Sequence, residues 1–172
     1  MNKSITETKV RPMTLEDIDA IFFIDHKIRR SGEAVTYSNL TTEHIFMIDR
    51  HIGSLERPVS YVDLIHGDVS QLLQFGLVAE IEGHVRGFAL GRLAHVGKAT
   101  AKIGEIPILG VHPDYQRTGI ATELLNTLCD RFRSEGFKEV RIEVDEHDKD
   151  LLGFIERLGF GVGHRIEYSK KL

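Results

Sequence analysis

The sequence predicts one α+β domain, with a mixed β-sheet and flanking helices, that spans residues 1–172. Two apolar runs on either side of Glu82-Gly83 form a hairpin pattern, which indicates antiparallel strands. From Ile103 to Leu158 the pattern changes to strand, helix, strand, helix, which is typical of a parallel pairing. The chain has 172 residues, of which 41% are hydrophobic, and this suits a single core.

The N-terminal part begins with a short strand at Val10-Arg11-Pro12. Thr14 is then suited to cap a helix, with Asp17 three residues later. Apolar residues at helical spacing follow the cap: Leu15, Ile18, Ile21 and Phe22. We therefore expect the first helix to begin directly after the first strand.

A second helix is predicted over residues 41–52, where Ile45, Ile48 and Ile52 form one stripe and Gly53 ends it. Residues 54–74 contain Gly and Pro and have no clear periodicity, so they are expected to be irregular. Residues 28–40 and 54–74 are the segments that we expect to line an acceptor pocket, but they carry no motif.

In the central part, the hairpin strands are expected at 77–81 and 85–90, and a further strand at 103–111. A long helix ending at Gly136 follows, on the stripe Ile120, Leu124, Leu125, Leu128 and Phe132. Val140, Ile142 and Val144 alternate as a strand, residues 148–158 form another helix, and the tail is expected to close the sheet.

Composition excludes several classes of function. No window approaches the ~20 apolar residues that a membrane helix needs, and the first residues lack the apolar core of a secretory signal. The single cysteine, Cys129, cannot form an internal disulfide, which favours the cytoplasm. The net charge of −4 disfavours nucleic acid as a partner, and no two of the nine histidines stand four residues apart, which disfavours a metal site.

The segment from Leu109 to Ala121 carries the clearest chemical pattern. A buried strand ends at Val111, Pro113 breaks it, and a polar turn leads into a helix that opens near Gly119. The first amides of a helix have no internal partners and lie at the positive end of its dipole, so they bind anions. Arg117 adds a positive charge. The segment therefore predicts a pyrophosphate cradle, with an ordinary strand-to-helix turn as the alternative.

This segment resembles the acetyl-CoA signature of the GNAT superfamily, Gln/Arg-x-x-Gly-x-Gly/Ala after Val-x-Pro. The residues that match are Val111, Pro113, Gln116, Gly119 and Ala121. Leu158-Gly159-Phe160 is similar to the motif after the family's fourth helix, and residues 11–17 are similar to its opening. The resemblance implies a twisted mixed sheet of about six to seven strands with about four helices, and acetyl transfer from acetyl-CoA to an amine. A Rossmann turn does not fit, because it needs three glycines.

The resemblance also implies a set of acetyl-CoA contacts. The backbone of Leu109, Gly110 and Val111 is expected to bind the pantetheine arm. The pyrophosphate is expected on the amides of Gln116, Arg117, Thr118, Gly119, Ile120, Ala121 and Thr122. Asp148 stands where the family has a cofactor-binding Asn, and Ile155 replaces the Tyr that protonates the leaving thiolate. That role could pass to water, Tyr115 or Tyr168.

An amine must lose a proton before it attacks a thioester, so the reaction needs a base. Glu105 stands six residues before Val111, where the resemblance places the glutamate of histone-type enzymes. Glu143, in the next strand, matches the glutamate of the branch that modifies ribosomal-protein N-termini and is the alternative base. The alternative reading of Glu105 is an exposed residue at the start of its strand.

Other polar residues near the motif have simpler interpretations. Acidic residues at Asp145, Glu146, Asp148 and Asp150 either stabilise the start of a helix or attract a cationic amine. His112 is expected at the surface, and Cys129 in the core.

Two functions remain open. One is an active N-acetyltransferase for a protein N-terminus, lysine or small amine, as a monomer or homodimer. The other is a catalytically weak acyl-CoA-binding module that acts as a sensor or interaction partner.

Overall fold

The computed structural model describes residues 7–30, 74–94, 102–144, 146–164 and 170–171. The helix predicted over 41–52 and the irregular segment before residue 74 lie outside this part of the chain. Residues 160–164 do not form the closing strand that was expected in the tail. Residues 165–169 are not among the residues that the structure describes.

The described residues form one five-stranded sheet in the order β1-β2-β3-β4-β5. The strands are β1 (Lys9–Pro12), β2 (Leu77–Ile81), β3 (His84–Leu93), β4 (Ile103–Val111) and β5 (Glu139–Arg141). The first four pair antiparallel, and β5 pairs parallel to β4. The predicted mixed sheet is thus confirmed, with five strands in the described part instead of six to seven.

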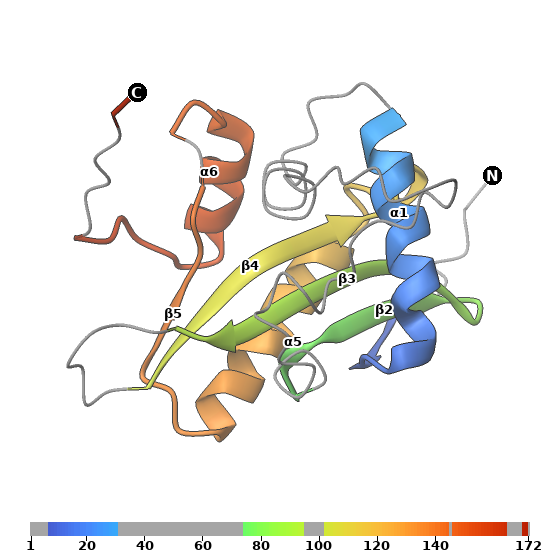
Figure 1. Ribbon diagram of the computed structural model, residues 1–172, viewed down its shortest axis with the longest axis horizontal. Helices are drawn as coiled ribbons and strands as arrows, with labels where there is room; N and C mark the ends of the chain where they lie inside the picture. The colour runs from blue at the N-terminus through green and yellow to red at the C-terminus, as the bar shows by residue number, and fades with distance from the viewer. Residues whose placement is uncertain (1–6, 31–73, 95–101, 145, 165–169, 172) are drawn as a thin grey trace.

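Helices cover both faces of this sheet, as Figure 1 shows. They are α1 (Ile18–Arg30), α5 (Ile120–Ser134) and α6 (Lys149–Arg157), with short 3-10 helices η1 (Leu15–Asp17) and η2 (Pro113–Tyr115). Helices α1 and α5 lie on opposite faces, and α6 lies beyond the end of β5 (Figure 1). The predicted helices after Thr14, Gly119 and Asp148 are therefore confirmed.

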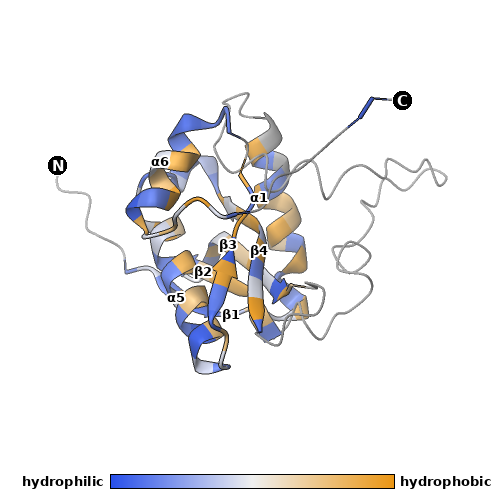
Figure 2. Ribbon diagram, turned by 90° about the vertical axis from the view of Figure 1, so that its left-hand side faces the viewer, coloured by the Kyte–Doolittle hydropathy of each residue, from blue (hydrophilic) through white to orange (hydrophobic). Residues whose placement is uncertain are grey.

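Two hydrophobic clusters hold the layers together, one on each face of the sheet. Under α1, Ile21, Ile24 and Ile28 pack against buried side chains of β3 and β4. The larger cluster joins α5 and α6 to the other face and includes Phe132, Leu125 and Ile155. In Figure 2 the helices carry both hydrophobic and hydrophilic bands, as amphipathic helices should. Burial of these apolar faces is the main stabilising contribution.

The start of the chain is fixed by polar contacts that the sequence indicated. Thr14 and Asp17 form a capping box at η1. Asp17 also accepts two 2.7 Å hydrogen bonds from the Arg11 guanidinium, which holds the pKa of that carboxyl below its usual range. The expectation for Leu15 was wrong, because it lies in η1 ahead of α1 and its side chain is 57% exposed.

The β2–β3 hairpin confirms the prediction from Glu82-Gly83. Both residues have positive φ, 52° and 75°, as a two-residue hairpin turn requires. The strand predicted through Val144 was too long, because β5 ends at Arg141.

Candidate functional site

The paired region between β4 and β5 is short, and the two strands separate beyond it. Only residues Ile103–Glu105 of β4 have partners in β5, opposite Glu139–Arg141. Beyond Glu105, β4 continues to Val111 along β3 alone. Figure 1 shows the two strands diverging from this point. The second half of β4 thus has no strand on that side in the described part of the chain.

The backbone polarity of this open edge follows from the alternation of an antiparallel ladder. The His112 amide donates to the Arg86 carbonyl at 2.8 Å, so residue 112 faces β3. Alternate residues of β4 face opposite sides, and the backbone groups of Leu109 and Val111 therefore point toward the open edge. These are two of the three residues predicted to bind a pantetheine arm. An extended amide-bearing arm can hydrogen-bond there as a strand would.

An irregularity that the sequence reading missed shapes this edge. The β3–β4 register shifts between Leu90 and Arg92, so Ile106 and Pro107 together stand opposite Gly91. This is a β-bulge, which bends and twists the strand that carries it. Pro107 was the available signal, because proline inside a strand is confined to edges and bulges.

The turn after β4 is held by hydrogen bonds between residues close in sequence. The Gln116 side-chain amide donates to the Val111 carbonyl at 3.3 Å, and the Thr118 hydroxyl donates to the Tyr115 carbonyl at 2.5 Å. Arg117 has φ of 59° and Gly119 has φ of 94°. The two residues flank Thr118, and a turn in which left-handed residues alternate with others can point its N–H groups inward as an anion-binding concavity.

Gly119 is the N-cap of α5, and no side chain caps that helix. The amides of Ile120, Ala121 and Thr122 therefore have no partner within the helix. A Cβ at Gly119 would have no atom of the described residues within 4 Å, so these residues leave the space over the turn open. Glycine is needed there for the positive φ of 94° rather than to avoid a neighbouring atom. Of the amides predicted to bind pyrophosphate, those of Ile120, Ala121 and Thr122 are thus brought together at the helix terminus, whereas the Gln116 amide donates to the Pro113 carbonyl at 3.3 Å.

His112 lies in the wall behind this turn, and the expectation that it lies at the surface was wrong. The residue is 6% exposed, and its ring lies 5.9 Å from that of Phe23 and 5.6 Å from that of Tyr115, centroid to centroid. Its Nδ1 accepts from the Asp114 amide at 3.3 Å. Burial lowers the pKa of His112, so it is the neutral ring that holds the turn.

Glu105 lies at the last paired position of β4, where the two strands part. Its Oε2 accepts a 2.7 Å hydrogen bond from Nε of Arg92 on β3. The side chain of Glu105 is half-buried. Neither Arg92 nor this ion pair was anticipated, although a cross-strand partner is the ordinary way to satisfy a carboxylate among apolar residues. The alternative base, Glu143, lies beyond the end of β5 and is exposed.

Asp148 and Ile155 both have structural contacts around α6. The Asp148 carboxylate accepts from the Leu151 amide at 3.0 Å and caps α6. Ile155 is 6% exposed and packs in the α5 cluster.

Of the candidate acids, Tyr115 packs under the Arg86 guanidinium, 4.8 Å from ring centroid to Cζ, and Tyr168 lies outside the described residues. Cys129 packs against the core as predicted, and burial raises the pKa of its thiol.

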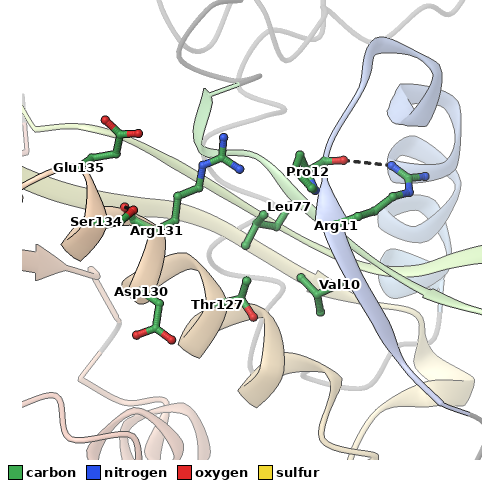
Figure 3. Close-up of a pocket in the computed structure, with 9 residues that line it drawn as sticks. All are labelled: Val10, Arg11, Pro12, Leu77, Thr127, Asp130, Arg131, Ser134 and Glu135. Atoms are coloured by element: carbon green, nitrogen blue, oxygen red, sulfur yellow. Dashed lines mark hydrogen bonds between the residues drawn. The ribbon is translucent and has the colours of Figure 1, made fainter.

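A groove of about 480 Å³ lies elsewhere, between α5 and the first two strands. Figure 3 shows its lining, with Val10 and Leu77 on the strand side and Thr127 and Arg131 on α5. None of the predicted site residues lines it. In the described ranges, no three His, Cys, Asp or Glu side chains come together as metal ligands, and no helix is long and apolar enough to span a bilayer.

Comparison with known proteins gives the same fold. An aminoglycoside acetyltransferase from an uncultured soil metagenomic sample, in complex with sisomicin, superposes with a TM-score of 0.62 at 17% identity, covering 96% of each chain. The AAC(6')-Iy enzyme, in complex with a CoA bisubstrate analogue, gives 0.64 at 14% identity over 96% of this chain and 99% of that one. The ribosomal-protein-S18-alanine N-acetyltransferase from Escherichia coli gives 0.61 at 17% identity, with 90% and 78% covered.

The sequence itself matches the model of the Acetyltransferase (GNAT) family over residues 42–160, which is more than half of the chain. The match includes β4, the turn with Gly119, and α6. The chain belongs to the GNAT acetyltransferase family.

Proposed function

We propose that this protein transfers an acetyl group from acetyl-CoA to a primary amine by direct attack within a ternary complex. The observation that carries the proposal is the uncapped N-terminus of α5 beside the open edge of β4. The helix terminus suits a pyrophosphate, and the strand edge suits the amide groups of a pantetheine arm. Solved relatives with CoA or a CoA analogue bound support the same co-substrate.

In this reaction the amine nitrogen attacks the thioester carbonyl carbon and loses a proton, and the carbon–sulfur bond then breaks. Glu105 takes the amine proton, directly or through one water. Oε2 is held by Arg92, which leaves Oε1 to receive the proton. The acetyl group ends on the amine, and the departing sulfur is protonated to give CoA. A free thiol has a pKa near ~8.5, so the thiolate can leave without a strong acid beside it.

Two substitutions, one at each end of α5, test acetyl-CoA binding. Gly119→Glu adds a carboxylate at the proposed phosphate site. Gly136→Glu is the matched control, because Gly136 at the other end of α5 also has positive φ, 83°, and open space around it. Both should fold with similar strain. We expect calorimetry to show acetyl-CoA affinity reduced by more than about 100-fold in the first variant only, from charge repulsion at close range. Equal affinities would refute the assignment.

The acyl-CoA-binding module remains the second candidate, because Ile155 packs in the core at the position of the family's acidic tyrosine. Thiol release from acetyl-CoA with a panel of amines separates the two. CoA binding with no release for any amine favours the module. A cytoplasmic location, predicted from the single cysteine, is retained as part of the proposal.

A further inference from the structure

Three charged side chains form a row across the strands where β4 and β5 part. Arg92 of β3 is the register partner of Glu105, and Glu105 is that of Arg141 in β5. The row lies at the last paired position before the open edge of β4. Neighbouring strands stand ~4.8 Å apart, so the three side chains begin close to one another.

All three project from the face of the sheet away from α5. A Cβ at Gly104 would lie 2.8 Å from the Phe132 ring of α5, so the next residue, Glu105, faces the opposite side. Val140 packs in the α5 cluster, so Arg141 likewise faces away from it. Arg92 is on the same face, because it reaches the Glu105 carboxylate. The two arginines therefore lie on the same face of the sheet as the proposed base, Glu105.

Arg141 differs from Arg92 in what it binds. The Nε of Arg141 donates to Glu139, two residues earlier on the same strand, which fixes the plane of the guanidinium. Its Nη1 is buried and has no hydrogen-bond partner among the residues that the structure describes. A buried charged donor without an acceptor is costly, so such a group is a place where a ligand is expected.

We propose that Arg141 binds a carboxylate of the acceptor, so that the amine acetylated here is an amino acid or a peptide with a nearby carboxylate. This proposal rests on the proposed function and names the class of its second substrate. Guanidinium groups recognise carboxylates through paired hydrogen bonds. With the acceptor carboxylate on Arg141, the acceptor amine lies toward Glu105 on the next strand.

The charges around Arg141 favour a single negative charge over a phosphate group. Glu139 accepts from the Nε of Arg141, and Glu105 is the register partner of Arg141 on β4. Their two carboxylates repel an incoming anion, and a phosphate, with nearly twice the charge of a carboxylate, is repelled more strongly. The same two carboxylates attract the ammonium group of an amino acid.

The test uses pairs of amines that differ only by a carboxylate: glycine with methylamine, 5-aminopentanoate with butylamine, and peptides with Asp or Asn at the second position. We expect the carboxylate member of at least one pair to have a kcat/KM about 10- to 100-fold higher, the range for a hydrogen bond to a charged group. Arg141→Gln should remove this preference while leaving the acetyl-CoA affinity unchanged. Arg141→Lys, which keeps the charge but loses the fork, should restore part of it.

Arg133→Gln is the matched control, because Arg133 is an exposed, ion-paired arginine on α5. Calorimetry of the same amines on the protein–CoA complex provides a readout that needs no turnover. If transfer proceeds equally well for both members of every pair, the carboxylate site is wrong and the proposed function stands. If no amine is acetylated but carboxylate amines bind in an Arg141-dependent way, the site stands and the proposed function fails. Loss of the preference in Arg133→Gln as well would also overturn the proposal.

Discussion

The two edges of β4 differ in how far the sheet satisfies their backbone, and one of them is the proposed site. On the β3 side, its register pairs run from Gly104 to Val111, interrupted by a single bulge. On the β5 side, pairing stops after Glu105. The paired edge satisfies its backbone within the sheet. On the open edge the Val111 carbonyl accepts from the Gln116 side chain, and the other backbone groups of Leu109 and Val111 have no strand partner in the described part of the chain. The proposed acetyl-CoA site therefore depends on pairing that the fold leaves incomplete.

The side chains above the two edges follow the same division. Over the paired region, Gly91 and Gly104 let the Phe132 ring lie directly on the strands, because a Cβ at either position would come within 2.8 Å of it. On the opposite face of the sheet, at the point where the open edge begins, the charged residues Arg92, Glu105 and Arg141 stand at paired positions. Substitutions on the paired side should therefore change stability, and substitutions on the open side should change rate or specificity.

Glu105→Gln gives the largest effect that we expect on the open side. The amide keeps the shape of the carboxylate but cannot take a proton from the amine. Positioned bases contribute about 10²–10⁴-fold, so kcat should fall by that factor while acetyl-CoA affinity is preserved. Steady-state kinetics with a working amine acceptor, together with calorimetry, would measure both quantities.

Glu143→Gln is the control for this experiment, since Glu143 is exposed beyond β5. Its kcat should stay near that of the unmodified protein. If Glu143→Gln instead shows the fall in kcat, the base is Glu143, and Glu105, where β4 and β5 part, has another role.

Phe132→Ala is the corresponding change on the paired side. Phe132 is fully buried between α5 and the sheet, stacked 4.7 Å from Phe75, centroid to centroid. Removing a buried phenylalanine ring costs about 3–5 kcal/mol in unfolding free energy. Urea denaturation should show this loss, while kcat measured on the folded fraction changes little. A variant with normal stability and lost turnover would contradict the division between the two edges.

The same division explains which features could be predicted from the sequence. The hairpin at Glu82-Gly83, the Thr14 cap and the α5 stripe depend on neighbours in the chain, so local patterns were sufficient. The early end of β5 was not predictable, because Ile142 and Val144 still alternate and only tertiary pairing decides where the strand stops.

The candidate site was likewise predicted only in part from the sequence. The turn with Gly119 was found from its spacing, because a helix start with glycine is a local signal. The burial of His112 and the partners of Glu105 come from α1 and β3, far away in sequence. Such tertiary contacts do not produce a local sequence pattern, so a single sequence cannot predict them.

Ile155→Tyr tests whether the family's phenol can be restored. The residue is buried in the α5 cluster, so the larger ring would overpack it, at a cost of about 1–3 kcal/mol. We expect a lower urea midpoint, with kcat unchanged or higher over pH 6 to 10. A sharp fall in kcat with normal stability would show that Ile155 shapes the acceptor pocket rather than the core.

Asp148 gives the smallest effect, and it separates a cap from a cofactor ligand. Its carboxylate accepts from the Leu151 amide, and a side-chain cap is worth about 1 kcal/mol. Asp148→Ala should lower the unfolding free energy by that amount. Asp148→Asn, which keeps an accepting oxygen, should leave it nearly unchanged, because Asn and Asp cap equally well. If the residue also contacts acetyl-CoA as the family's Asn does, Asp148→Asn should raise acetyl-CoA affinity, because it removes a negative charge near the phosphates. Unfolding curves with and without acetyl-CoA would measure both effects on the same samples. Equal affinity in all three proteins, with the stability loss confined to the alanine variant, would make Asp148 a cap alone and leave α5 as the sole anion site in the described part of the chain.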